Sequence, residues 1–364
     1  MNPQHTGNVV RHWLARTWQW LTRLRDRPIV REMSGDGHAA RYRMPAAVAM
    51  FAYVIAPLHM VPAHAEEWPS KPVRMVVPFA AGGATDLLAR ALAVELGRQW
   101  KQPVVVDNRP GAGGAVGAEA VAKAAPDGYT LLLASGSMFT VNPYIYPKLP
   151  YSAESFEMIS KVASGPMVVT VNVKVPAKTM EELIGYARAH PGKLSFASAG
   201  NGSQVHMASE AFADAAGIDI VHVPYKGEGP AYSDLMAGVV DMTVGNINAI
   251  SPLLKGGRLR ALAVTGKERS PLLADVPTVA EAGMPGFSFY GWFALMAPAG
   301  TPKDLASRMY ADLERAMAEP VMQRYLVSQG MTRTITPKGR LGDEIAQESG
   351  RWKQLVGKRK ISAN

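Results

Sequence analysis

The sequence predicts an α/β protein of two domains with a ligand cleft between them. The chain has 364 residues, more than twice the roughly 150 residues of a typical domain. Along most of this length, short apolar strands alternate with Gly-rich turns and Ala-rich helical stretches, which is typical of buried parallel sheets covered by helices. The pattern occurs twice, and the chain then crosses back toward the first domain.

In the first domain the pattern predicts three strands and two helices. The expected strands are 73–79, 103–108 and 130–135, and the expected helices are 86–100 and 118–125. Each strand is short, β-branched and apolar, as expected for a sheet covered on both faces.

The same pattern resumes after the apolar segment 166–172 and predicts the second domain. Its expected helices are 180–190 and 203–217, and its expected strands are 193–198, 220–225, 240–246 and 259–266. The segment 286–300 crosses back, and C-terminal helices are expected at 303–330 and 340–356. We therefore expect one lobe to comprise 66–166 and 293–364, and the other to comprise 167–292.

Composition and charge exclude several classes of protein. The chain has no cysteine, which excludes disulfide scaffolds, thiolate metal sites and a Cys nucleophile. Of the net charge of +9, the first 65 residues carry +5, from eight arginines and three acids. The remainder holds 31 basic and 27 acidic residues without a basic stripe, so nucleic acid is not an expected partner.

Residues 1–65 are interpreted as an N-terminal extension followed by an export signal. Arg41 and Arg43 precede an apolar stretch at 44–61, and a small-x-small site ends at Ala65. This order is typical of a secretory signal peptide, with cleavage expected after Ala65 and a periplasmic mature protein. An uncleaved membrane anchor is the alternative interpretation. Because residues 1–40 lie upstream of the signal, the true start is expected at Met33 or Met44.

Two Gly-rich loops, 78–86 and 198–206, each follow a strand and open a helix. Such a turn directs backbone N–H groups and the positive end of the helix dipole toward an anion. Neither loop contains the Gly-Lys-Ser/Thr of a nucleotide phosphate loop, so a carboxylate fits better than a triphosphate. A tight turn that needs glycine only for packing remains the structural alternative.

The Gly-rich loop 110–117 resembles a dinucleotide fingerprint, but its spacing differs, and the next strand ends in Ala134 and Ser135 rather than in an acid. We therefore interpret it as a turn and expect no cofactor. The histidines do not cluster and no acid/base pair stands out, so we expect no metal site either. Ser203 and His206 lie three residues apart at a helix start, where a serine is usually an N-cap; a secreted serine hydrolase is the enzymatic alternative.

Six segments in order resemble one family along essentially the whole mature chain. They read WPSKPVRMVVPFAAGGATDLLAR, VVVDNRPGAGGAVGAEAVAKAAPDGYTLL, ASAGNGSQVHMASE, HVPYKGEGPAYSDLMAGVVD, LRALAVTGKERSPLLADVPTVAEAGMPGF and APAGTP. In this order they resemble the extracytoplasmic substrate-binding receptors of tripartite tricarboxylate transporters, the Bordetella uptake gene (Bug) receptors. The resemblance implies a two-lobed periplasmic-binding-protein fold, type II-like, that closes on a small carboxylate.

The resemblance also implies the ligand-binding residues. They are Phe79, Ala81, Gly83, Asp86, Ser137, Ser198, Ala199, Gly200, Asn201, Gly202, Ser203, His206, Tyr225, Lys226 and Asn246. Many relatives carry an acid at the position of Gly245, just before Asn246, and its loss here weakens the case for a ligand with an amino group. A mono-, di- or tricarboxylic acid is the expected ligand.

The resemblance implies a binding protein rather than an enzyme, a monomer that delivers its ligand to integral-membrane permease subunits. A periplasmic sensor that passes its closed form to a signalling partner would use the same fold and is the alternative within this class. A further, structural alternative leaves residues 1–65 as a membrane tether.

Overall fold

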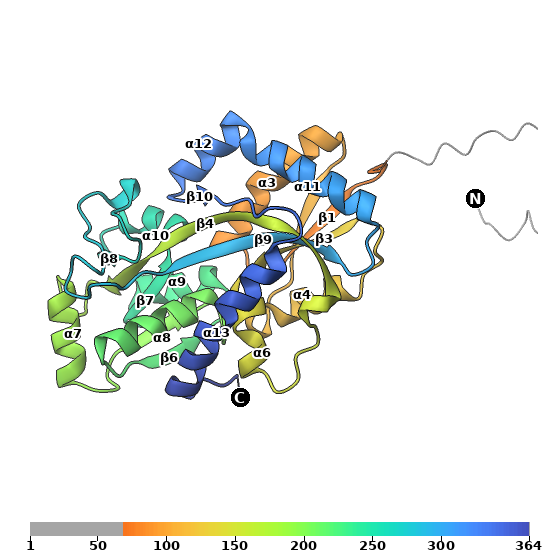
Figure 1. The fold of residues 1–364 in the computed structure, drawn as a ribbon. Coiled ribbons are helices and arrows are strands. Elements are labelled where there is room, and N and C mark those ends of the chain that lie inside the picture. The colour runs from red at the N-terminus through yellow and green to blue at the C-terminus, as the bar shows by residue number, and fades with distance from the viewer. Residues whose placement is uncertain (1–67, 364) are drawn as a thin grey trace, which may run out of the picture. The chain divides into compact units, whose positions relative to one another are not determined.

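The computed structural model describes residues 68–363, so the extension and signal peptide expected in 1–65 lie outside the described residues. Its strands are β1 (Val73–Val77), β2 (Val104–Asn108), β3 (Thr130–Ser135), β4 (Phe156–Asn172), β5 (Ser195–Ser198), β6 (Val221–Pro224), β7 (Met242–Asn246), β8 (Leu259–Val264), β9 (Tyr290–Pro298) and β10 (Thr332–Arg333). Figure 1 shows helices flanking these strands.

The helices predicted at 86–100, 118–125 and 180–190 are found within three residues of their expected bounds, whereas the two short helices within 137–145 were not predicted. The α-helices are α3 (Ala84–Trp100), α4 (Ala115–Ala122), α5 (Ser137–Thr140), α6 (Asn142–Ile145), α7 (Met180–Ala189), α8 (Gln204–Ala216), α9 (Glu228–Ala237), α10 (Ile247–Leu254), α11 (Lys303–Ala318), α12 (Pro320–Ser328) and α13 (Leu341–Arg359). The single helix expected at 303–330 is two helices, because Pro320 begins α12 and cannot continue the backbone hydrogen bonds of α11.

The strands form two groups joined by β4 and β9. The order is β2-β1-β3-β9-β4-β7-β5-β6, with β8 and β10 also paired to β4. In the first lobe β1 lies parallel to β2 and β3, and in the second β5 lies parallel to β6 and β7. The expectation of wholly parallel sheets needs correction, because β4 and β9 are antiparallel to their neighbours.

Strand β4 extends through both lobes. Its first half pairs with β9 and β10, and its second half pairs with β7 and β8. The sequence predicted only its second half, because Ser160, Lys161 and Ser164 interrupt the apolar run of the first. Ser160 is fully buried, and its hydroxyl donates to the Thr336 carbonyl at 3.1 Å and accepts from the Thr336 amide at 3.0 Å.

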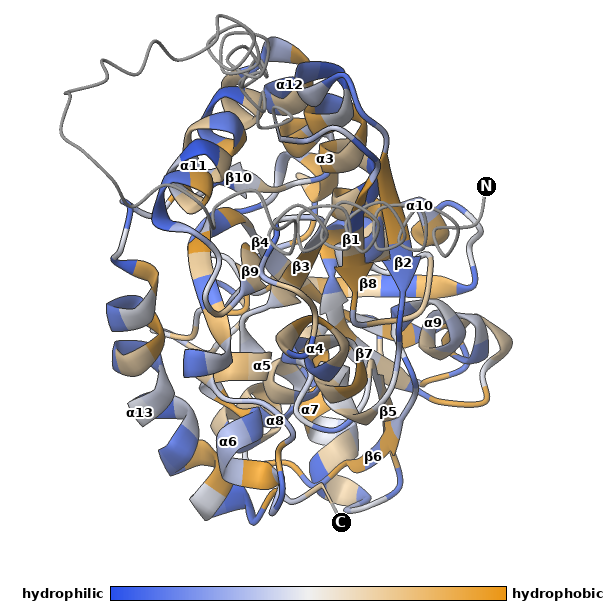
Figure 2. Ribbon diagram, turned by 90° about the vertical axis from the view of Figure 1, so that its right-hand side faces the viewer, coloured by the Kyte–Doolittle hydropathy of each residue, from blue (hydrophilic) through white to orange (hydrophobic). Residues whose placement is uncertain are grey.

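Buried apolar residues cover the strands of both lobes. In Figure 2, hydrophobic residues gather on the central strands, whereas α11 and α13 show bands of hydrophilic and hydrophobic residues. This banding is typical of amphipathic helices that cover a core with one face. Within residues 68–363, no helix combines the length and apolar character needed to span a membrane.

Helix α13 contacts elements of both lobes, although the sequence predicted a return to the first lobe alone. It packs on α5, α6 and β4, and it also contacts α8 of the second lobe. Arg359 pairs with Glu210 and Lys358 pairs with Asp214, each at 2.8 Å, on α8. Figure 1 shows α13 passing beside α8 and α6.

Candidate functional site

The first Gly-rich loop connects β1 to α3 and is braced by Asp86. The Asp86 carboxylate accepts hydrogen bonds from the Gly82 amide at 3.0 Å and from the Asn108 side chain at 3.0 Å, and it pairs with Arg90 at 2.9 Å. Burial acts to raise the pKa of Asp86, but hydrogen bonds from Arg90, Gly82 and Asn108 leave it below its ordinary value. Asp86 is therefore an ionised brace of the loop.

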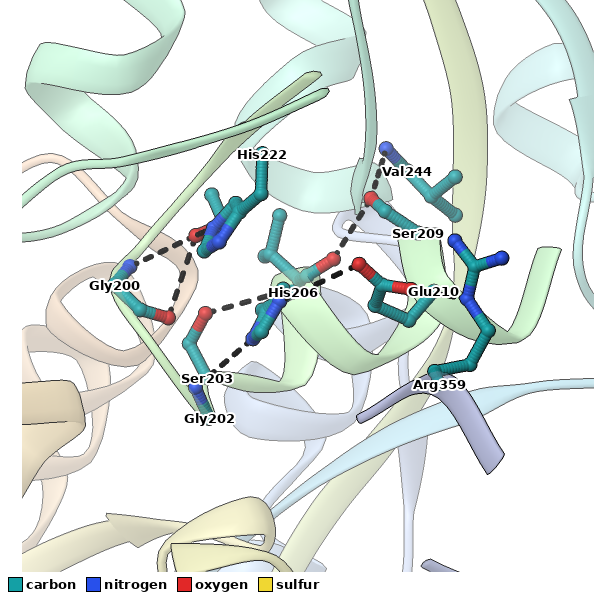
Figure 3. Close-up of polar contacts among 11 residues, drawn as sticks. Gly200, Gly202, Ser203, His206, Ser209, Glu210, His222, Val244 and Arg359 are labelled. Atoms are coloured by element: carbon teal, nitrogen blue, oxygen red, sulfur yellow. Dashed lines mark hydrogen bonds and ion pairs between the residues drawn. The ribbon is translucent and has the colours of Figure 1, made fainter. Parts of the chain in front are cut away.

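The second Gly-rich loop connects β5 to α8. Ser203 caps α8, because its hydroxyl oxygen accepts a hydrogen bond from the His206 amide at 3.2 Å. Gly202 has φ of +76°, a conformation that side chains disfavour, and its amide donates to Nδ1 of His206 at 3.0 Å. Figure 3 shows these contacts around the first turn of the helix.

Two histidine rings stack beneath this loop, which corrects the expectation that the histidines do not cluster. The centroids of His206 and His222 are 3.8 Å apart with an interplanar angle of 9°. His222 Nε2 lies 2.6 Å from the Ser198 hydroxyl, and that hydroxyl also accepts the Gly200 amide at 3.1 Å. His206 Nε2 lies 3.7 Å from Glu210, which binds Arg359 (Figure 3). The histidines thus fix the shape of the Gly-rich loop.

Ser203 and His206 are not arranged as a nucleophile and its base. The Ser203 hydroxyl contacts the backbone amide of His206, whereas Nδ1 of the ring accepts the Gly202 amide. A base must lie within hydrogen-bond reach of the nucleophile it activates. The two side chains form a helix cap and a loop brace.

The segment 225–228 lies against both Gly-rich loops. The Tyr225 amide donates to the Ser198 carbonyl at 3.1 Å, and the Ala80 amide donates to the Lys226 carbonyl at 3.2 Å. Glu228 then accepts a hydrogen bond from the Ala84 amide at the start of α3. The two loops that the sequence singled out are thereby joined through a third strand-to-helix turn.

A cavity of about 550 Å³ opens beside the second Gly-rich loop. Its lining residues are Gly111, Ala112, Gly113, Tyr146, Ala199, Gly200, Asn201, Pro224, Tyr225, Lys226, Pro230 and Ala363. These residues include one cation and no acid. The Tyr146 hydroxyl, whose pKa burial raises to about 12, donates to the Asn201 carbonyl at 3.1 Å and so holds the second Gly-rich loop. The cavity is therefore suited to an anion.

The predicted site residues divide into three sets. Those lining the cavity are Ala199, Gly200, Asn201, Tyr225 and Lys226. Those buried outside its lining are Phe79, Gly83, Asp86, Ser137, Ser198, Gly202, Ser203, His206 and Asn246. Ala81 is exposed, at the loop between β1 and α3.

Several residues around the cavity were not singled out from the sequence. The loop 111–113, interpreted only as a turn, lies against the second Gly-rich loop: a Cβ on Gly113 would lie 2.1 Å from the Asn201 carbonyl oxygen. Its run of positive φ angles includes the non-glycine Ala112, at +47°. In the sequence, the spacing of the glycines was the signal that could have identified this loop as part of the site. Glu228 was also missed, although it directly follows Gly227 at a helix start.

The free energy of unfolding is expected to depend on pH through the protonation of His222. Burial, with a smaller contribution from His206 and against the opposing effect of Glu210, lowers the pKa of His222 from 6.5 to about 3. The fold therefore favours the neutral ring, and the unfolded chain binds the extra proton between these values. The free energy of unfolding should fall as pH decreases from 6.5 toward 3, by at most about 1.4 kcal/mol per pH unit from this group.

Urea unfolding across that pH range measures the free energy of unfolding and tests this expectation. His222→Asn should flatten the profile relative to the wild-type protein, whereas His190→Asn, at an exposed histidine, should leave it unchanged. Equal slopes in the wild type and His222→Asn would contradict a neutral, buried His222.

The described part of the chain holds no set of side chains that together could ligate a metal ion. Among residues 68–363, no group of three or more His, Asp or Glu side chains is arranged to hold a metal ion. At the cavity, Lys226 supplies a cation that can attract an anion.

Comparisons with known proteins agree with this fold. The family model described as "Tripartite tricarboxylate transporter family receptor" matches residues 88–361. Protein BugT of Bordetella pertussis is 39% identical over 297 residues, which cover 81% of this chain and 91% of that protein.

Two solved structures extend the comparison. Rpa4515 of R. palustris, solved with adipate, has a TM-score of 0.78 and 34% identity, covering 81% of this chain and 99% of that one. MatC of Rhodopseudomonas palustris, solved with bound malate, has a TM-score of 0.74 and 33% identity, covering 79% and 100%. The predicted two-lobed α/β fold is confirmed, and the chain belongs to the tripartite tricarboxylate transporter family of receptors.

Proposed function

We propose that this protein is a periplasmic receptor that captures a small organic carboxylate between its lobes and delivers it to the membrane subunits of a tripartite tricarboxylate permease. The proposal names a mono-, di- or tricarboxylic acid as the ligand class. It assigns the protein no catalytic step, because the Ser203 and His206 side chains are engaged in capping and bracing.

The observation that carries the proposal is the cavity beside the second Gly-rich loop. One wall is the loop at 199–201 and another is the loop at 111–113 from the opposite lobe. Lys226 supplies the positive charge, and no lining residue is acidic. A carboxylate held by main-chain donors and one cation would contact both lobes and favour their closure.

The relatives support the ligand class. Adipate and malate, present in the two Rhodopseudomonas structures, are both small carboxylic acids. Those chains are 34% and 33% identical to this one, and the chemical group that their two ligands share is the carboxylate.

The proposal includes a processed, monomeric receptor with lobes at 66–166 plus 293–364 and 167–292. Edman sequencing of the exported protein should begin at Glu66. A chain that begins upstream of Arg41 would contradict cleavage and favour a tether.

Carboxylate binding is tested by a thermal-shift screen of residues 66–364 against carboxylates, amino acids and phosphate. A ligand at 100 times its Kd should stabilise the fold by about 2.7 kcal/mol, which raises the Tm by several degrees. The protein should first be unfolded and refolded, so that no ligand from the expression host remains bound. A response to phosphate or amino acids without any response to carboxylates would overturn the assignment.

A further inference from the structure

Ala363, which follows α13, is part of the wall of the cavity beside the second Gly-rich loop. The other lining residues come from 111–113, 146, 199–201 and 224–230. Among the described residues, Ala363 is thus the one contribution to the lining from the chain beyond α9, and it lies outside the residues 88–361 that match the family model. Figure 1 shows the segment after α13 running toward α6. Ala363 therefore adds a wall that the Gly-rich loops alone do not supply.

The turn that ends α13 directs this segment back toward the core. Lys360 has a φ of +53°, the left-handed conformation in which helices commonly end. The Ile361 amide donates to the Val356 carbonyl at 3.0 Å, and both Ile361 and Ala363 pack against the core cluster that contains Val356. The path of the chain into the cavity wall is therefore set by the end of the helix.

The backbone of Ala363 connects the two lobes at the cavity. Its amide donates to the Ile145 carbonyl at 3.1 Å, at the end of α6 in the first lobe. Its carbonyl accepts from the Asn201 side chain at 3.5 Å, in the second Gly-rich loop. Tyr225 contacts this loop elsewhere, because its amide donates to the Ser198 carbonyl. Ala363 and the turn that follows β6 therefore contact different parts of the same loop.

Arg359, the last residue of α13, ties the helix end to the same loop. Its Nε donates to the Glu210 carboxylate at 2.8 Å, and the two side chains are only 23% and 10% exposed. Glu210 also lies 3.7 Å from Nε2 of His206, whose Nδ1 accepts the Gly202 amide (Figure 3). Removing one partner of a largely buried ion pair is strongly unfavourable, because the other charge is left unpaired. Arg359 therefore holds the end of α13 against the loop that Ala363 contacts.

We propose that Ala363 is a ligand-binding residue that limits the size of the ligand, and that Arg359 is the positioning residue that holds it in the cavity wall. The inference rests on the proposed function, since it takes the ligand to be a carboxylate. Within residues 68–363, Lys226 is the one charged side chain of the lining, so it attracts the carboxylate. The rest of the ligand extends along the second Gly-rich loop toward the methyl group of Ala363.

The size limit is tested by isothermal titration with straight-chain acids of three, five and seven carbons. The probes are propionate, pentanoate, heptanoate, malonate, glutarate and pimelate. Ala363→Leu should weaken the longest acid that the wild type binds by at least tenfold, and the loss should shrink as the acid becomes shorter. Ala318→Leu, at an exposed position of α11, adds the same side chain and should change no affinity. A loss that is equal at all chain lengths would overturn the size limit.

The placement of Ala363 is tested without any ligand, by hydrogen exchange of its backbone amide. That amide should be protected in the ligand-free protein, and Arg359→Gln should speed its exchange at least tenfold by releasing the end of α13. Arg359→Lys keeps a cation for Glu210 and should retain most of the protection. Arg324→Gln, at an exposed position of α12, removes the same charge and should have no effect. An unprotected Ala363 amide in the wild type, or equal exchange in all four proteins, would overturn the proposal.

The two experiments separate the possible failures. If acids bind but Ala363→Leu weakens none of them, the proposed function stands and the role of Ala363 is overturned. If the Ala363 amide is protected through Arg359 but no carboxylate binds in titration or in the thermal-shift screen, the placement of Ala363 stands. The proposed function then fails, and the size limit fails with it.

Discussion

Replacing Gly202 with alanine is expected to abolish carboxylate binding and to lower the free energy of unfolding by about 4 kcal/mol. Gly202 adopts φ of +76°, which is unfavourable for alanine. The added Cβ would also lie 2.3 Å from Oδ1 of Asn142 and 2.5 Å from the Ile145 side chain. Asn142 cannot move freely, because its amide donates to the Gly113 carbonyl at 3.1 Å. The collision is therefore transmitted to both loops that line the cavity.

The matched control is Gly257→Ala. Gly257 has a similar φ of +68°, but no atom lies within 4 Å of its added Cβ, so only the backbone cost of about 1–2 kcal/mol applies. Urea unfolding gives the difference in stability, and titration with the carboxylate identified by the thermal-shift screen gives the loss of binding. If the two variants lose equal stability and Gly202→Ala still binds, packing between the loops does not shape the site.

Local signals in the sequence were sufficient to predict the strand-loop-helix units. An apolar strand, paired glycines and an amphipathic helix follow one another within the segments 73–100 and 193–217. The loops at 78–86 and 198–206 could therefore be identified before any contact was known. The same reasoning found Ser203, whose capping role depends only on the next three residues. Elements whose stability is decided locally are the ones that a single sequence predicts best.

Features that depend on distant partners could not be predicted. Glu228 resembles an ordinary first-turn acid of α9, yet its partner Ala84 lies 144 residues earlier. His222 follows the alternation of a strand, and nothing near it indicates that its ring stacks on His206. The first half of β4 carries polar residues whose partners lie far along the chain, as the contact between Ser160 and Thr336 shows. In each case the chemistry of the residue is set by tertiary contacts.

Gly136→Ala should lower the free energy of unfolding by about 3 kcal/mol through packing alone. The backbone at Gly136 is right-handed helical, with φ of −55° and ψ of −39°, so alanine meets no conformational penalty there. Its Cβ, however, would lie 2.2 Å from the nearest ring atom of Trp292. The indole is held in place by Glu348, which accepts its N–H at 2.7 Å, and Lys161 lies 4.7 Å from its ring centroid.

The same substitution should weaken ligand binding, because Trp292 also connects to the second Gly-rich loop. Its backbone amide donates to the side-chain oxygen of Gln204, the first residue of α8, at 3.2 Å. Gly185→Ala is the control: it adds the same methyl group at an exposed position of α7, where no atom lies within 4 Å of the added Cβ. It should stabilise the protein by about 0.5–1 kcal/mol. If Gly136→Ala behaved like Gly185→Ala in urea unfolding, the Trp292 ring would have to move freely. Its two hydrogen bonds would then contribute little to positioning α8.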